Sequence, residues 1–87
     1  MRILMVEDEN RLSEAVARIL KANHHQVSLA SDGEEGLECA LSDRYDIIIL
    51  DIMLPKLDGI SVLRKLRRAG VHTPVIMLTA RGETEDK

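Results

Sequence analysis

Three runs of four apolar residues constrain the possible folds of this chain most strongly, because each run stops at a polar residue. The runs cover residues 3–6, 47–50 and 75–78, and they lead into Glu7-Asp8, Asp51 and Thr79. Short apolar runs separated by segments with helical spacing are typical of parallel strands that helices cover on both faces. Parallel strands end at one edge of their sheet, so we expect three carboxylates and a hydroxyl to meet in a crevice there. Carboxylates gathered in this way favour a hard cation.

The segments between these strands predict three helices and one further strand, with residues that favour each end. The first helix follows Asn10, a candidate N-cap. The second helix opens at residues 31–34, which have the form of a capping box, and a short strand at residues 27–30 precedes it. The third helix lies between Asp58, a candidate cap, and Gly70, a candidate left-handed terminator.

Strands and helices alternate along the whole chain, without a repeat, a low-complexity tract or a linker. This alternation predicts one α/β domain over residues 1–87, with a doubly wound parallel sheet. Residues 81–87 resemble a loop that enters a helix, but no apolar turn follows. We therefore expect a fold that is cut short after the fourth strand.

The charge balance and the hydropathy exclude two classes of partner. The chain has 12 basic and 15 acidic residues and a net charge of −3. Nucleic acids and anionic membranes attract positive charge, so this balance argues against generic binding to either. No apolar stretch reaches the ~18 residues that a membrane span needs, and Met1 leads directly into a strand rather than a signal peptide. We therefore expect a cytoplasmic protein.

Three motifs follow one another along the chain: residues 3–9, residues 51–55 with Asp58-Gly59, and residues 74–80. Together they resemble the receiver domains of bacterial two-component response regulators. The resemblance implies a flavodoxin-like parallel sheet with strand order 2-1-3-4, lacking the family's fifth strand and last helix. The motifs are most similar to the transcription-factor subclass, whose receivers precede a winged-helix DNA-binding domain that these 87 residues do not contain.

The resemblance also implies a role for each residue of the expected crevice. Asp51 would be the phosphoacceptor, whose carboxylate attacks the phosphorus of a phosphohistidine on a sensor histidine kinase. Mg²⁺ would be bound by Asp51, directly by Asp8, and by Glu7 through water. The backbone carbonyl of Met53 would be a further metal ligand. The hydroxyl of Thr79 would contact a phosphoryl oxygen and move toward it after phosphorylation, as a switch.

Two residues that the family carries on its fifth strand, a lysine and an aromatic residue, are missing. Receivers carry a lysine at the end of the fifth strand, where its ammonium pairs with the phosphoryl group, and neither Lys56 nor Lys87 lies at that position. Loss of such a charge can lower the rate of phosphoryl transfer by orders of magnitude. Whether this chain catalyses its own phosphorylation and dephosphorylation therefore stays open. The alternative is a truncated receiver that acts only as an oligomerisation or interaction module.

The sequence lacks residues that two other classes of α/β protein require. A dinucleotide-binding domain needs a glycine-rich turn after its first strand, where this chain has the acidic residues 7–9. A phosphatase with an Asp-x-Asp nucleophile needs an acid where Met53 stands.

The fourth strand also predicts self-association. Without a fifth strand, residues 75–78 would form an exposed, uncharged edge, which is a template for another chain. Without the last helix, an apolar patch would remain on one face of the sheet. We therefore expect a homo-oligomer that pairs these edges or exchanges elements between chains.

Overall fold

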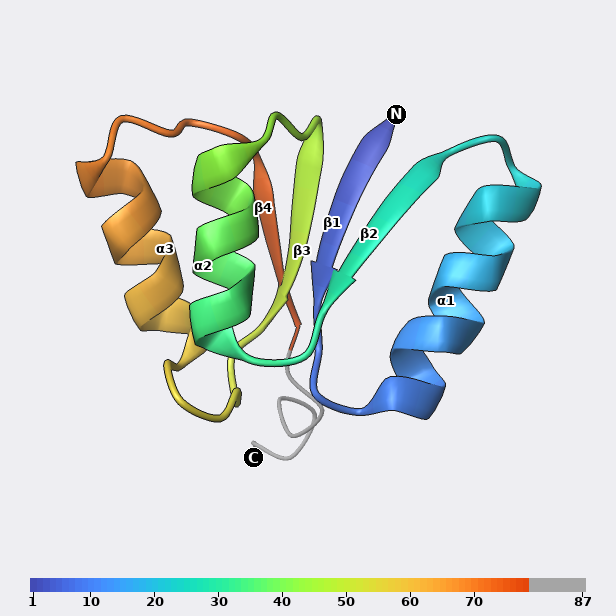
Figure 1. Cartoon of the computed structure of the whole chain (residues 1–87), viewed down its shortest axis with the longest axis horizontal. Helices are drawn as coiled ribbons and strands as arrows, with labels where there is room; N and C mark the ends of the chain where they lie inside the picture. Colours follow the sequence, from blue (N-terminus) through green and yellow to red (C-terminus); the bar gives the residue numbers. More distant parts are fainter. Residues whose placement is uncertain (79–87) are drawn as a thin grey trace, which may run out of the picture.

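The computed structural model describes residues 1–78, in which three helices cover the two faces of a four-stranded parallel sheet (Figure 1). The elements follow one another as β1 (Arg2–Val6), α1 (Asn10–Ala22), β2 (Gln26–Ala30), α2 (Gly33–Ser42), β3 (Ile47–Asp51), α3 (Gly59–Arg68) and β4 (Val75–Leu78). The strand order is β2-β1-β3-β4, and every neighbouring pair is parallel. The predicted α/β class and the predicted strand order are therefore confirmed.

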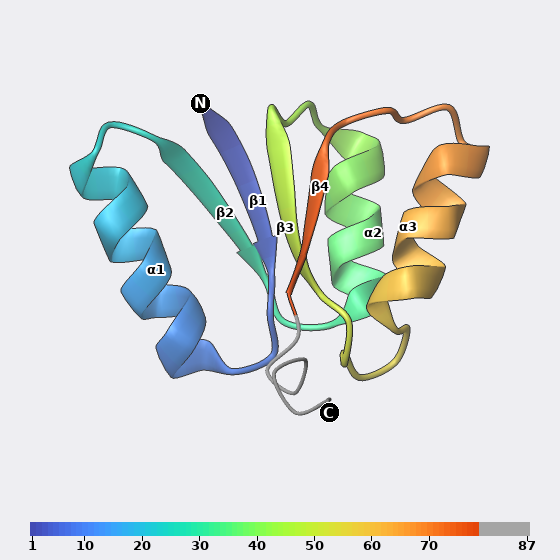
Figure 2. The ribbon, with the colours of Figure 1, turned by 180° about the vertical axis from the view of Figure 1, so that it is seen from behind.

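The main core lies between the sheet and two of the helices. Helices α2 and α3 cover one face of the sheet and α1 covers the other, as Figures 1 and 2 show from opposite sides. Alternate residues of a strand point to opposite faces, so β1 and β3 each send two apolar side chains toward α2 and α3. The buried cluster on this side consists of Leu4, Val6, Ala30, Ala40, Ile48, Leu50, Leu54, Val62 and Leu66.

The face that α1 covers is less completely buried. Helix α1 buries only the small residues Ser13 and Ala17, while Leu12 and Ile19 are 45% and 63% exposed. On β4, Val75 and Met77 pack against the core, so Ile76 between them points to the opposite face of the sheet, where it is 48% exposed. Large apolar side chains are therefore exposed on the α1 side. None of the helices in residues 1–78 is long and apolar enough to cross a membrane.

Two helix starts differ by one residue from those predicted. Asn10 is not an N-cap: it is the first residue of α1, and the residue before it makes no capping hydrogen bond through its side chain. The N-cap of α2 is Asp32 rather than Ser31, because the carboxylate of Asp32 accepts the Glu35 N–H at 2.8 Å. The Glu35 carboxylate in turn accepts the Ser31 N–H at 2.8 Å. The predicted box over residues 31–34 is therefore wrong, because the side chains that reach the free N–H groups are those of Asp32 and Glu35.

Both predicted ends of the third helix are confirmed. The Asp58 carboxylate accepts the Ser61 N–H at 2.9 Å and caps α3. Gly70 follows this helix with φ at 83°, the left-handed conformation in which glycine has no Cβ to clash.

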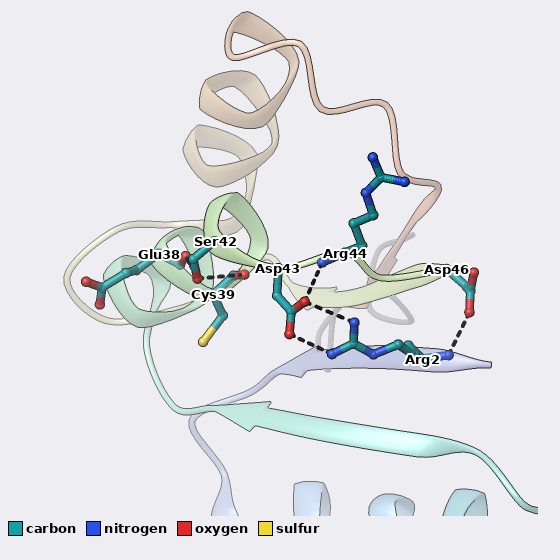
Figure 3. A network of polar contacts seen from close by, with 7 residues as sticks. All are labelled: Arg2, Glu38, Cys39, Ser42, Asp43, Arg44 and Asp46. Atoms are coloured by element: carbon teal, nitrogen blue, oxygen red, sulfur yellow. Dashed lines mark hydrogen bonds and ion pairs between the residues drawn. The ribbon is translucent and has the colours of Figure 1, made fainter.

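A polar network joins β1 to the turn before β3, at the edge of the sheet opposite the carboxyl ends of the strands (Figure 3). The Arg2 guanidinium donates hydrogen bonds of 3.0 and 2.6 Å to the Asp43 carboxylate, and the Arg2 N–H donates one of 2.7 Å to Asp46. The bond from Arg2 lowers the pKa of Asp43 below its usual value. The Arg2 and Asp43 side chains are 43% and 48% exposed, so this ion pair adds little stability.

Candidate functional site

The carboxyl ends of β1 and β3 bring together three carboxylates that are distant in the sequence. Glu7 and Asp8 directly follow β1, and Asp51 is the last residue of β3. One oxygen atom from each side chain lies within 4.8 Å of the other two. Glu7 and Asp51 are only 6% and 7% exposed, whereas Asp8 is exposed to solvent. The three carboxylates therefore form an acidic crevice in which two are buried and the third is open to solvent.

Backbone N–H groups orient the two buried carboxylates. A Glu7 carboxylate oxygen accepts the Glu9 N–H at 3.0 Å, and Oδ1 of Asp51 accepts the Met53 N–H at 3.1 Å. Within residues 1–78, neither carboxylate pairs with a lysine or an arginine. Buried charge without a counter-charge is costly. The donor set, three carboxylates from two strand ends, therefore fits a hard divalent cation.

The electrostatics of the crevice raise the pKa of Glu7. Burial is the largest cause, and the nearby carboxylates of Asp51 and Asp8 add to it, while the hydrogen bond from the Glu9 backbone acts in the opposite direction. Each of these upward effects disfavours the ionised form. A cation in the crevice would favour ionisation instead.

The raised pKa of Glu7 predicts a pH dependence of the metal-free fold. The folded state holds the Glu7 proton more tightly than the unfolded chain, whose carboxyl has the usual pKa of 4.5. Protonation of Glu7 therefore stabilises the fold fully at pH values below the pKa of the unfolded chain. This contribution is lost as the pH rises through the pKa of Glu7 in the folded state. We expect Glu7→Gln to flatten this fall, measured as urea unfolding in EDTA from about pH 4 to about pH 8. Glu14→Gln, on the exposed side of α1, should leave the fall unchanged, and identical profiles for wild type and Glu7→Gln would contradict the prediction.

The other two predicted site residues differ in what the structure describes. Met53 lies in the loop after β3, with its N–H on Asp51 and its side chain largely exposed, so only its backbone faces the acidic residues. Thr79 lies outside the described residues, and its predicted contact stays a prediction. The described chain ends at Leu78, whose carbonyl accepts the Ile52 N–H at 2.9 Å next to the end of β3.

A role for Gly59 at this site was not predicted. A Cβ on Gly59 would overlap the backbone oxygen of Asp51 and would lie 2.9 Å from the Cα of Ile52. Only glycine therefore lets the start of α3 pass directly under the strand end that carries Asp51. A signal was present in the sequence as Asp58-Gly59, since glycine, which has no Cβ, allows two pieces of backbone to approach closely.

Comparison with known proteins identifies the family to which this fold and crevice belong. A sequence model described as the response regulator receiver domain matches residues 3–87. The chain belongs to this family.

Two curated relatives of this receiver domain are a transcriptional regulatory protein and a response regulator. It is 51% identical over 87 residues to the transcriptional regulatory protein DltR of Streptococcus agalactiae, covering all of this chain and 39% of DltR. It is 44% identical over 87 residues to the response regulator MprA of Mycobacterium avium, again over the whole chain and over 38% of MprA. The receiver domain thus spans about two-fifths of the length of the relatives it matches.

Solved structures of receiver domains share its fold. The response regulator TrrA of Thermotoga maritima, in complex with Mg²⁺ and BeF, is 33% identical with a TM-score of 0.87, over 97% of this chain and 73% of that one. The receiver domain of the sensor histidine kinase PA1611 of Pseudomonas aeruginosa is 36% identical with a TM-score of 0.88, over 98% and 71%. That structure has a magnesium ion coordinated in its active-site cleft.

Proposed function

We propose that this receiver domain accepts a phosphoryl group on Asp51 from a phosphohistidine of a sensor histidine kinase. The observation that carries the proposal is the buried Asp51 carboxylate at the end of β3, within 4.8 Å of oxygens of Glu7 and Asp8. Family membership supports the same role. We further propose that residues 1–87 form one receiver unit, that its output is a DNA-binding domain of the winged-helix type elsewhere in a longer protein, and that it acts in the cytoplasm.

The reaction follows from the orientation of Asp51. A carboxylate oxygen attacks the phosphorus, the bond to the imidazole nitrogen breaks on the opposite side, and its electron pair leaves with the imidazole. The product is an acyl phosphate on Asp51. The Met53 N–H holds the carboxylate in one orientation throughout, so little rotational freedom is lost on the way to the transition state.

The residues that would hold Mg²⁺ are the three carboxylates and the Met53 carbonyl. Asp8 and Asp51 would be direct ligands, Glu7 would act through water, and the Met53 carbonyl would complete the protein's share. The fit rests on two buried carboxylates with no basic partner in residues 1–78. When bound, Mg²⁺ would supply the positive charge that offsets repulsion between these carboxylates and the incoming phosphoryl oxygens.

Binding of Mg²⁺ should stabilise the domain through Asp8. A ligand that binds only the folded state at about ten times its Kd adds about 1.4 kcal/mol to the free energy of unfolding. We expect this rise in wild type and its loss in Asp8→Asn, measured by thermal unfolding across a Mg²⁺ titration. Asp46→Asn, at the opposite edge of the sheet, is the control and should keep the full rise. An unchanged rise in Asp8→Asn would show that the metal ligands are assigned wrongly.

The direct test of the proposed function is phosphorylation of the 87-residue chain. After incubation with Mg²⁺ and a small phosphodonor, intact-mass analysis should show one added phosphoryl group. Peptide mapping after borohydride reduction of the acyl phosphate should then place it at residue 51. Either no mass gain or a phosphoryl group at another residue would refute the proposal.

A second candidate function is self-association without phosphoryl turnover. One observation favours it: among the described strands, β4 is an edge that pairs only with β3, and its Ile76 is 48% exposed. An exposed apolar edge strand is a template for another chain. A failure of phosphorylation in a chain that nevertheless assembles would favour this function over the first.

We expect the 87-residue chain to form a homodimer or a larger homo-oligomer at micromolar concentration, measured by sedimentation equilibrium. Ile76→Lys should shift the population toward monomer, because a charge at the edge opposes pairing. Ile19→Lys, which adds the same charge at an exposed position of α1, should shift it less. A well-folded wild-type monomer at this concentration would contradict the expectation.

A further inference from the structure

The loop between β3 and α3 contains a strained turn close to Asp51. The Leu57 N–H donates a hydrogen bond of 2.8 Å to the Pro55 carbonyl, and Lys56, the residue between them, has φ at 69°. A hydrogen bond across three residues with positive φ at the centre defines a γ-turn of the rare, strained form. Lysine has a Cβ and occupies this region of φ at an energetic cost. Such a conformation persists only where its surroundings hold it.

The start of α2 makes the contacts that hold this turn. The Gly33 N–H donates to the same Pro55 carbonyl at 3.2 Å. The Lys56 ammonium lies 3.7 Å from a carboxylate oxygen of Asp32, the N-cap of α2. A Cβ on Gly33 would overlap the Leu57 carbonyl oxygen and would lie 2.6 Å from its carbonyl carbon. Because these are backbone atoms, no side-chain movement could make room for a larger residue.

The turn is connected to the crevice through a short piece of chain. Only Leu54, which is 9% exposed and part of the core, separates Met53 from Pro55, the first residue of the turn. Met53 is the residue whose N–H holds Oδ1 of Asp51. With Leu54 anchored in the core and the turn held by α2, the Met53 peptide has little freedom to rotate. Release of the turn would release this peptide and its hydrogen bond.

We propose that Gly33 and the positive-φ turn at Lys56, which the Gly33 N–H holds through the Pro55 carbonyl, form a positioning clamp that sets the direction of the Met53 peptide, and through it the orientation of the Asp51 carboxylate. These are positioning residues, because they act through the loop and not on the reacting atoms. The functional role of the clamp rests on the proposed function, because the direction of the Met53 carbonyl matters only when Mg²⁺ binds in the crevice. Its structural effect on the Met53 peptide does not depend on a metal.

The first experiment compares Lys56→Val with Lys56→Gly. Both remove the ammonium that faces Asp32, but only valine strongly opposes positive φ, while glycine adopts it freely. The Lys56 side chain is 62% exposed, so neither change disturbs the core. By isothermal titration calorimetry, Lys56→Val should bind Mg²⁺ about fivefold more weakly than wild type or worse, the factor that corresponds to strain on the order of 1 kcal/mol. Lys56→Gly should stay within about twofold of wild type.

The second experiment needs no metal and uses a matched pair of glycines on α2. Gly33→Ala pushes a Cβ into the turn, whereas Gly36→Ala pushes one to within 2.7 Å of the Val6 methyl groups, on β1. In the metal-free domain, Gly33→Ala should shift the amide NMR resonance of Met53 and speed hydrogen exchange at the Leu57 N–H. Gly36→Ala should leave both unchanged even where it lowers stability as much.

Several outcomes would overturn the clamp. Equal Mg²⁺ affinities in the two Lys56 variants would do so, as would a Met53 resonance that is unchanged in Gly33→Ala. If Gly33→Ala does not fold, the Met53 amide resonance is compared between Lys56→Val and wild type instead, because Lys56 lies on the surface and its substitution should not unfold the domain. An unchanged resonance would then overturn the clamp. A wild-type domain that binds no Mg²⁺ refutes the proposed function, and the metal-free NMR comparison still decides the clamp.

Discussion

Asp51→Asn is expected to abolish phosphoryl incorporation. The amide has nearly the same shape as the carboxylate but no negative oxygen to attack phosphorus, so the reaction loses its nucleophile. The change also removes one of the charges that raise the pKa of Glu7, which lowers repulsion in the crevice. The variant should therefore remain folded, and without Mg²⁺ it should be at least as stable as wild type. Intact-mass analysis after reaction with a small phosphodonor and Mg²⁺ measures the loss.

The matched control is Asp46→Asn, which makes the same chemical change at the opposite edge of the sheet. Asp46 accepts the Arg2 N–H there, and an asparagine oxygen can accept the same bond. This variant should be phosphorylated to the wild-type extent. A phosphoryl mass gain that persists at the wild-type level in Asp51→Asn would mean that another residue is the phosphoacceptor.

Leu66→Ala is expected to remove a large part of the stability of the domain. Leu66 is fully buried in the cluster between α3 and the sheet, so truncation leaves a cavity that the packed neighbours fill only in part. Leucine-to-alanine changes at such sites cost about 3 to 5 kcal/mol. A domain of this size has roughly 4 to 13 kcal/mol of stability in total. Urea unfolding followed by circular dichroism should show a lower midpoint with a similar slope, or a chain that is already unfolded in water.

Ile60→Ala is the control on the same helix. Ile60 is 45% exposed, so its truncation removes less buried surface and should cost under about 1 kcal/mol. Equal losses in the two variants would mean that Leu66 is not part of a packed core.

The sheet and the acidic crevice could be predicted from the sequence because strong, regular signals carry them. Runs of four apolar residues identify β1, β3 and β4 to within one residue, and the parallel arrangement then places Glu7 and Asp51 at one edge. The helix starts were less predictable, since serine, aspartate and asparagine all favour an N-cap. Which of them serves depends on the backbone N–H groups within its reach, as the capping of α2 by Asp32 rather than Ser31 shows.

The loop after Asp51 could not be predicted in the same way. Nothing in the local sequence requires positive φ at Lys56, because that conformation depends on the start of α2, which lies on another part of the chain. The sequence predicted only that Gly33 lies at the start of a helix. Its second role, close contact with the Leu57 backbone, exists only once α2 and α3 lie side by side.

The strand order has a consequence for how the chain is made. Of the described strands, β1 leaves the ribosome first, yet it lies inside the described sheet, where Ile3 pairs with both Val27 and Ile47. Parallel partners cannot be supplied by a hairpin, so β1 keeps two open edges until β2 emerges and one until β3 does. During that interval a nascent apolar strand can pair wrongly with a neighbouring chain. Shielding of the N-terminal residues while translation proceeds is therefore a need that this topology creates.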